Sequence, residues 1–328
     1  MLILGIETSC DETSVALINN GTIVANEIYT QEIHSQYGGV VPEIASRAHM
    51  SKINSLCEAV FNKNNLTPRD IDLIAVTDSP GLAGALLVGI SFALGMHGSW
   101  GIPITGINHL EGHIFATLIE HADIGYPFLA LVVSGGHTSI YRVNDFGEYQ
   151  CLGETVDDAA GEAFDKIGKM LGFTYPAGSA IGREATLAPA DEPLIPFPVA
   201  RLGTSRFDFS FSGLKTSVKY YLQGKTPEFI AKNRPLICKS FEKTIVDALA
   251  GNLMAASRET GITNVAVVGG VASNLHLRER ISKEFGNTAF FPSPRLCTDN
   301  GAMIARAGYE RALRNMLRFP RMAPNAGL

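Results

Sequence analysis

Two histidines four residues apart are the clearest chemical feature of the sequence. They lie in the segment NHLEGH at 108–113, directly after an apolar run at 102–107. Asn108 is a favourable helix N-cap, and apolar residues then recur at helical spacing, which predicts a helix over 109–121. Four helical residues turn through about 400°, so His109 and His113 lie on one face and could bind one metal ion.

Glu111 distinguishes this pair from the H-E-x-x-H motif of metalloproteases. In that motif the Glu directly follows the first His and acts as the general base. Here it stands one place later, about 200° around the helix from His109, so it points away from a metal held by the pair. The segment therefore predicts a metal site without the protease base. Two histidines that only cap or hydrogen-bond at a helix start are the alternative.

A third ligand could come from the segment CTDNGA at 297–302, which opens the last helix, expected from near Asp299 to about Leu317. An Asp at a helix start is usually an N-cap. However, this helix should return to the region of the histidine pair, where Asp299 could complete a set of two His and one carboxylate. Such a set suits iron(II), zinc or manganese and leaves positions open for substrate or water.

The elements that must position these residues recur in the same order in both halves of the chain. Each half begins with a strand, a small polar turn and two further strands, and a helix follows. The expected strands and helices are 2–7, 14–18, 22–29 and 42–62 in the first half, and 128–133, 139–143, 149–153 and 157–171 in the second. This order predicts an internally duplicated α/β fold with two mixed sheets, each flanked by helices.

Small polar turns follow the strands at 8–13, 134–138 and 269–274. Small residues let backbone N–H groups approach phosphate oxygens closely, and a helix N-terminus adds partial positive charge. The three turns together predict a nucleotide cleft between the two halves. A long, proline-rich stretch over 175–212 is either functional or mobile. A helical region is expected from Pro235 to about Glu259.

Composition limits the class of protein. The chain has 328 residues, of which 46% are hydrophobic and 18% charged, which fits two globular domains. No apolar run reaches the roughly 20 residues that cross a bilayer, and the five cysteines are scattered as expected of reduced thiols. We therefore expect a cytoplasmic protein without a membrane partner. The net charge of −5 means that binding of a nucleic acid would need a local basic patch.

Several longer segments make the pattern specific. They are LGIETSCDETS, GGVVPEIASRAH, HLEGHIFA, LVVSGGHTS, GETVDDAAGEAFDKIGKMLG, FSFSGLKT, VVGGVASN and CTDNGAMIA, in this order from Leu4 to about Arg306. The chain resembles the tRNA threonylcarbamoyladenosine transferase family, called TsaD in bacteria and formerly described as O-sialoglycoprotein endopeptidase. The resemblance implies a duplicated actin/Hsp70/sugar-kinase (RNase H-like) fold. Its N-terminal lobe would span 1–126 and be joined by the C-terminal helix 300–328, and its C-terminal lobe would span 127–299, with an insertion at about 173–245.

The resemblance also implies a reaction. The threonylcarbamoyl group of threonylcarbamoyl-AMP would pass to N6 of the adenosine 3′ of the anticodon in tRNAs that read ANN codons, and AMP would leave. One divalent metal ion per subunit is implied, with iron(II) expected first and zinc second. The implied partners are tRNA, a paralogous actin-fold protein (TsaB-like) and a small P-loop ATPase (TsaE-like).

The family pattern assigns residues to these roles. The metal ligands would be His109, His113 and Asp299. The substrate contacts would be Val132, Val133, Ser134, Gly135, Gly136, Asp165, Gly178 and Asn274. For the proton of the attacking amine, Asp11 and Glu12 are candidates, with turn hydrogen bonding as an equal alternative, and His137 is a third candidate.

The chain departs from the family pattern after Tyr175. The family has an acidic residue where this chain has Gly182, so a second ribose carboxylate is missing, and Glu184 stands two residues late. Arg311, Arg314 and Arg318 fall on one face of the expected last helix, as either a solvated face or a tRNA contact. Two other functions stay open: a metalloprotease, and a small-molecule kinase or nucleotide-binding module of the same fold.

Overall fold

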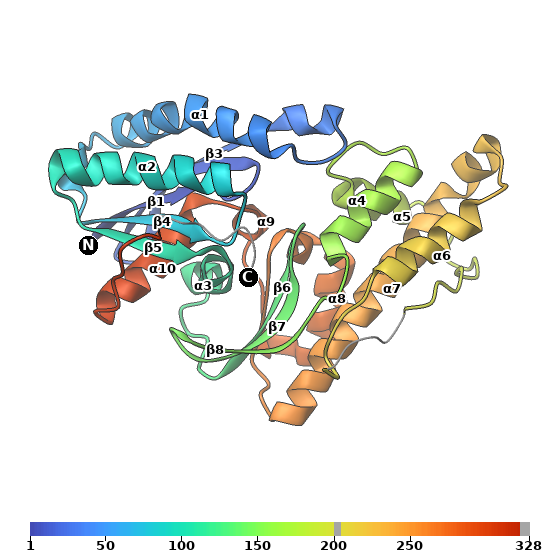
Figure 1. Cartoon of the computed structure of the whole chain (residues 1–328). Coiled ribbons are helices and arrows are strands. Elements are labelled where there is room, and N and C mark those ends of the chain that lie inside the picture. Colours follow the sequence, from blue (N-terminus) through green and yellow to red (C-terminus); the bar gives the residue numbers. More distant parts are fainter. Residues whose placement is uncertain (200–204, 322–328) are drawn as a thin grey trace. The chain divides into compact units, whose positions relative to one another are not determined.

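The computed structural model describes residues 1–199 and 205–321 (Figure 1). The chain forms two compact units. Unit 1 comprises Met1–Asp123 and the described residues from Arg295 onward, and unit 2 comprises Ile124–Pro294. Residues 322–328 of the expected N-terminal lobe and 200–204 of the expected insertion lie outside the described residues.

Unit 1 is built on a five-stranded sheet in the order β3-β2-β1-β4-β5. β1, β2 and β3 pair antiparallel, and β4 and β5 continue from β1 in parallel. Asn20 and Gly21 both have positive φ, as the tight turn between β2 and β3 requires. The strands are β1 (Leu2–Glu7), β2 (Glu12–Asn19), β3 (Thr22–Thr30), β4 (Leu73–Ser79) and β5 (Ile104–Asn108).

Helices cover both faces of this sheet (Figure 1). On one face, α1 (Pro42–Lys63) and α2 (Ala83–Trp100) pack on alternate residues of β1, such as Leu4 and Ile6. α2 is long and apolar enough to cross a membrane, but its Leu86 and Ile90 lie in this core. The other face carries α3 (His109–Glu120) and α10 (Gly301–Leu313).

The close approach of α10 to β1 depends on two glycines. A Cβ atom at Gly5 would overlap the backbone carbonyl of Gly301, and one at Gly301 would crowd the backbone of Ala16. The amide of Gly301 also donates to Ser14 Oγ at 2.8 Å. The start of α10 is therefore held directly against β1 and β2.

Unit 2 repeats the sheet of unit 1 in the order β10-β9-β6-β7-β8. β6, β7 and β8 pair antiparallel, whereas β9 and β10 continue from β6 in parallel. The predicted duplication is therefore confirmed. The strands are β6 (Phe128–Val133), β7 (Thr138–Asp145), β8 (Glu148–Glu154), β9 (Val265–Val268) and β10 (Ala289–Phe290), and the helices are α4 (Ala160–Met170), α5 (Gly178–Ala185), α6 (Ser212–Leu222), α7 (Pro227–Thr260) and α8 (Leu275–Phe285), with α9 (Pro294–Cys297) following.

Four helix predictions need correction. The helix predicted at 157–171 begins at Ala160, because the Asp157 carboxylate accepts hydrogen bonds from Ser210, Phe211 and Ser212 instead. The stretch 175–212, predicted as a long loop, contains α5.

The other two corrections concern helix ends. α7 begins at Pro227 under the Thr226 N-cap and runs through Pro235, where a start was predicted. The last helix ends at Leu313 and not near Leu317, because Asn315 has a φ of 55° in the left-handed region.

Candidate metal centre and substrate turns

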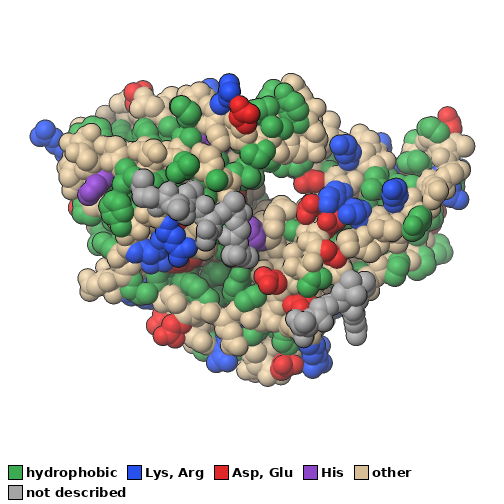
Figure 2. Space-filling view, viewed as in Figure 1, with side chains coloured by type: hydrophobic (Ala, Val, Ile, Leu, Met, Phe, Trp, Pro, Cys, Tyr) green, Lys and Arg blue, Asp and Glu red, His purple; other side chains and the backbone are tan. Residues whose placement is uncertain are grey.

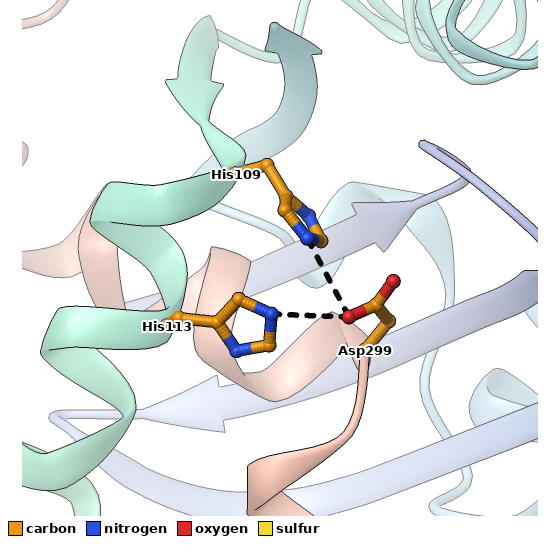
Figure 3. A group of neighbouring side chains, drawn as sticks. All are labelled: His109, His113 and Asp299. Carbon is orange, nitrogen blue, oxygen red and sulfur yellow. Dashed lines mark hydrogen bonds and ion pairs between the residues drawn. The ribbon is translucent and has the colours of Figure 1, made fainter. Parts of the chain in front are cut away.

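The helix that carries the histidine pair forms as predicted. Asn108 caps α3 by accepting hydrogen bonds from the amides of Leu110 and Glu111 at 2.9 and 3.2 Å. One turn apart on this helix, the rings of His109 and His113 pack edge to face with their centroids 4.7 Å apart. Both rings are buried, which fixes their direction toward the start of α10 (Figure 3).

Asp299 faces the two rings because it is not the N-cap of its helix. The cap is Asn300, whose Oδ1 accepts from the amide of Met303 at 3.0 Å. The alternative role of Asp299 as the N-cap is therefore excluded. Its Oδ1 lies 3.0 Å from Nε2 of His113 and 3.5 Å from Nε2 of His109 (Figure 3).

A fourth residue, Glu7, orients His109. It ends β1, is fully buried, and its Oε2 lies 3.0 Å from Nδ1 of His109. Thr77 Oγ1 donates to the same oxygen at 2.7 Å, and the amide of Ser9 donates to Oε1. Because Nδ1 is engaged by Glu7, Nε2 of His109 is directed at Asp299. Metal-binding histidines are commonly held in this way by a carboxylate.

The charges of this group are strongly coupled. Burial alone would lower the pKa of His109, but the carboxylates of Asp299 and Glu7 outweigh it and raise that pKa well above its usual value. Burial would raise the pKa of Asp299, but His109 and His113 hold it well below its usual range. Burial would raise the pKa of Glu7, but the charge of His109 and the hydrogen bonds from His109 and Ser9 together lower it. A protonated His109 therefore lies between two carboxylates.

These residues fit a divalent metal ion. One ligand atom from each of His109, His113 and Asp299 lies within 4.8 Å of the others. Zinc, a representative divalent ion, binds His nitrogen and carboxylate oxygen at about 2.0–2.2 Å, so its ligand atoms are roughly 3–3.5 Å apart. The observed separations of 3.0 and 3.5 Å from Asp299 are in this range. The group is compatible with a divalent metal site of two His and one carboxylate.

The raised pKa of His109 predicts a pH-dependent metal affinity. A metal at Nε2 must displace the proton, and Asp299 and Glu7 keep that proton bound above the usual imidazole range. Affinity should therefore rise with pH, roughly tenfold per pH unit for one displaced proton, until pH passes the raised pKa of His109. Zinc titrations between about pH 6 and pH 8 measure this slope. An affinity that stays constant over this interval would contradict the protonated state of His109.

Glu111 is not part of this group. Its Oε2 accepts from Arg311 at 2.8 Å, on the side of α3 that packs on α10. The prediction that Glu111 points away from the metal pair is confirmed. The same contact corrects the arginine surface proposed for tRNA, because Arg311 is only slightly exposed. Arg314 is paired with Glu310, and Arg318, beyond the end of α10, is paired with Asp78.

Basic residues on the α4 and α6 surface of unit 2 are also paired with acids. Figure 2 shows acidic and basic side chains next to one another over the part of unit 2 formed by α4 and α6. Asp158 there binds both Lys166 and Lys215 at 2.7 Å. This surface is therefore not a purely cationic patch.

The three acid–base candidates lie in different settings. Glu12 begins β2, and burial together with the charges of Asp11 and Asp299 raises its pKa well above its usual value. Asp11 precedes it in the turn, and its carbonyl accepts from the amide of Gln31. His137 is in unit 2, where its amide donates to Ser134 Oγ at 3.1 Å and its carbonyl accepts from the amide of Ser134.

The expected substrate turn of unit 2 is an exposed backbone loop at the end of a buried strand. Val132 and Val133 end β6, and their side chains are buried. Gly135 and Gly136 are exposed, a Cβ atom at either would meet open space, and no hydrogen bond among the described residues uses their amides. These amides are available to a ligand.

Two other glycines pack against this turn. A Cβ atom at Gly161, in the first turn of α4, would overlap the carbonyl of Ser134. A Cβ atom at Gly269, which follows β9, would overlap the carbonyl of Val133, and Gly269 has a φ of 91°. The structure thus brings together the second and third of the predicted small turns with the start of α4.

Asp165, Gly178 and Asn274 are linked through neighbouring elements of unit 2. Asp165 Oδ1 accepts from the amide of Ala177 at 2.7 Å, directly before Gly178 at the start of α5. Asn274 caps α8 and donates to Glu242 of α7 at 2.6 Å. α5 and α7 pack together, so these positions share one region.

Sequence reasoning missed Glu7 and Glu242. The signal for Glu7 was a carboxylate at the end of an otherwise apolar strand, LILGIE, since an unpaired charge is costly to bury. Glu242 lies in a helix of mixed composition and gave no comparable signal in the sequence.

Comparisons with known proteins agree with this geometry. The sequence model of the family tRNA N6-adenosine threonylcarbamoyltransferase (TsaD) matches residues 22–306. A relative of that name from Thermodesulfovibrio yellowstonii is 47% identical over 323 residues, covering 96% of this chain and 95% of the relative. Another, from Geotalea uraniireducens, is 49% identical over 315 residues, covering 94% and 90%.

Solved structures of lower identity share the fold. HypF of T. kodakarensis has a TM-score of 0.63 at 16% identity, covering 97% of this chain and 48% of HypF. Component A of (R)-2-hydroxyglutaryl-CoA dehydratase from Acidaminococcus fermentans has a TM-score of 0.56 at 14% identity, covering 95% and 99%. The expected α/β fold of the actin/Hsp70/sugar-kinase type is confirmed. At the identities given above, the chain belongs to the tRNA N6-adenosine threonylcarbamoyltransferase family and is a transferase that modifies tRNA.

Proposed function

We propose that the chain transfers the threonylcarbamoyl group of threonylcarbamoyl-AMP to N6 of the adenosine 3′ of the anticodon in tRNAs that read ANN codons. The exocyclic amine forms a bond to the carbamoyl carbon, the bond from that carbon to the phosphate oxygen breaks, and AMP leaves with the electron pair. One proton of the amine passes to a base. The observation that carries the proposal is the His109–His113–Asp299 group in a chain of this family.

We assign the metal to this group, with iron(II) expected first and zinc second. Nε2 of each histidine and Oδ1 of Asp299 would hold it, and Glu7 would keep the ring of His109 in place. A bound divalent ion supplies Lewis-acid polarisation of an oxygen of the donor. The low pKa of Asp299 keeps its carboxylate ionised, as a metal ligand requires.

The remaining roles belong to side chains and backbone groups of this chain. The free amides of Gly135 and Gly136 would bind an anionic oxygen of the donor. Contacts to its adenosine would come from the region of Asp165, Gly178 and Asn274, beside Val132, Val133 and Ser134. Asp11, Glu12 and His137 are the candidate proton acceptors, and burial with the charges of Asp11 and Asp299 raises the pKa of Glu12, which strengthens its carboxylate as a base.

Proposed partners are tRNA, a TsaB-like actin-fold paralogue and a TsaE-like P-loop ATPase, in the cytoplasm. The support for these is the family alone. The exposed face of α1, which carries the exposed Met50, is the surface that we propose for docking of the paralogue.

The test is reconstitution of the reaction. The purified chain is incubated with tRNA and threonylcarbamoyl-AMP, with and without the partners, and the digested tRNA is analysed for the modified nucleoside by mass spectrometry. We expect the modification on ANN-decoding tRNAs only. Protein cleavage that depends on the histidine pair would favour the metalloprotease, although Glu111 is bound to Arg311. Phosphate transfer from ATP to a small alcohol, without tRNA modification, would favour the kinase.

A further inference from the structure

Glu242 is a buried carboxylate in α7 with few partners. The residue is 7% exposed. Its Oε1 accepts from Asn274 Nδ2 at 2.6 Å, and the nearest ionisable partner is His276, whose Nδ1 lies 3.6 Å from Oε2. Among the described residues, no lysine or arginine forms an ion pair with it. Burial of a carboxylate with so little compensation is costly, which indicates a role beyond packing.

The Glu242 carboxylate lies beside Gly182, which has no side chain. A Cβ atom at Gly182 would lie 3.3 Å from Oε1 of Glu242 and 3.8 Å from Nδ2 of Asn274. An acidic side chain at position 182 would therefore extend into the space beside the Glu242 carboxylate. Glu184, the other acidic residue of α5, accepts from Arg234 at 3.0 Å and is engaged there. The carboxylate next to Asn274 thus comes from α7 and not from α5.

One oxygen of Glu242 is left to accept a hydrogen bond from a ligand. Both polar atoms of the Asn274 side chain are used, since Oδ1 accepts from the amide of Leu277 and Nδ2 donates to Glu242. Among the described residues, the hydrogen bond that the Glu242 carboxylate accepts comes from Asn274 and is made to Oε1. Oε2 lies 3.6 Å from Nδ1 of His276, too far for a hydrogen bond, so it can accept from a hydroxyl group. Carboxylates of this kind bind ribose hydroxyls in nucleotide sites.

We propose that Glu242 binds a ribose hydroxyl of the adenylate and so replaces the acidic residue that is missing at position 182. The proposal rests on the proposed function, which supplies the adenylate. It names Glu242 as a specificity-determining residue, with Asn274 holding its carboxylate in position.

The test compares binding of AMP, 2′-deoxy-AMP and 3′-deoxy-AMP by calorimetry. The wild-type chain should bind AMP at least roughly tenfold more tightly than the analogue that lacks the bound hydroxyl, as expected for a hydrogen bond to a charged group. Glu242→Gln should weaken AMP binding by a similar factor and leave binding of that analogue unchanged. Gln keeps an oxygen for Asn274, so the melting temperature should change little. Glu259→Gln, on an exposed part of the same helix, is the matched control.

A second variant tests whether a carboxylate at position 182 can take the role of the carboxylate of Glu242. Gly182→Asp places another carboxylate beside Glu242, so it should weaken AMP binding through repulsion. The double variant Gly182→Asp/Glu242→Gln should recover discrimination between AMP and the deoxy analogue.

The outcomes separate this inference from the proposed function. Unchanged discrimination in a folded Glu242→Gln variant, or no measurable AMP binding by the wild-type chain, overturns the role of Glu242 even where tRNA is modified. Loss of discrimination in Glu242→Gln supports it even where reconstitution yields no modified nucleoside.

Discussion

A chain with both His109→Ala and His113→Ala is expected to lose its bound metal and its transfer activity together while it stays folded. The variant removes two of the three ligand atoms and leaves only Oδ1 of Asp299. Lewis-acid stabilisation is worth several kcal/mol, so transfer should fall roughly 100- to 1000-fold or more. Metal content by mass spectrometry of the purified protein, with transfer to tRNA measured on the same sample, checks both losses.

The matched control for this variant is His121→Ala. His121 follows α3 at its C-cap and is not part of the metal group. It should keep both metal and transfer. Transfer at the wild-type rate by a metal-free double variant would refute the proposed role of the group.

Replacement of Glu7 by Gln is expected to have the second-largest effect. Glu7 is fully buried, and its charge helps to hold His109, so the neutral amide weakens the orientation of that ring. Changes at such outer residues typically cost 10- to 100-fold in metal affinity or activity. We expect a loss of roughly this size in zinc affinity, with all three ligands still present.

Thr77→Val provides the comparison for Glu7→Gln. It removes the hydroxyl that donates to Glu7 Oε2 but leaves the carboxylate beside His109. Its effect on zinc affinity should be the smaller of the two. Equal zinc affinity in Glu7→Gln and the wild type would show that Glu7 only fills space at the end of β1.

The sequence predicts the fold well where local signals and the global pattern agree. Asn20-Gly21 marks a hairpin, Asn108 marks a helix start, and apolar runs mark the buried strands of each sheet. The repeated order of these elements is enough to predict the duplication. His109 and His113 are predicted together, because helical spacing alone places them on one face.

The rest depends on contacts between residues far apart in the chain. Asp299 and Asn300 are both good N-caps by residue type, and the packing of Gly301 on β1 and β2 decides between them. The pairing of Glu7 with His109 spans 102 residues, and no local pattern reports it. For the same reason, only the structure shows that Gly182 lies beside the carboxylate of Glu242.

Because unit 1 is discontinuous in sequence, its parts are synthesised at different times. The strands of its sheet, together with Glu7, His109 and His113, all precede Asp123 in the sequence. Asp299 and α10 follow unit 2 in the sequence. During translation, Asp299 is therefore added only after the whole of unit 2 has been made. A chain truncated before Asp299 would keep Glu7 and both imidazoles but would lack the carboxylate that faces their Nε2 atoms.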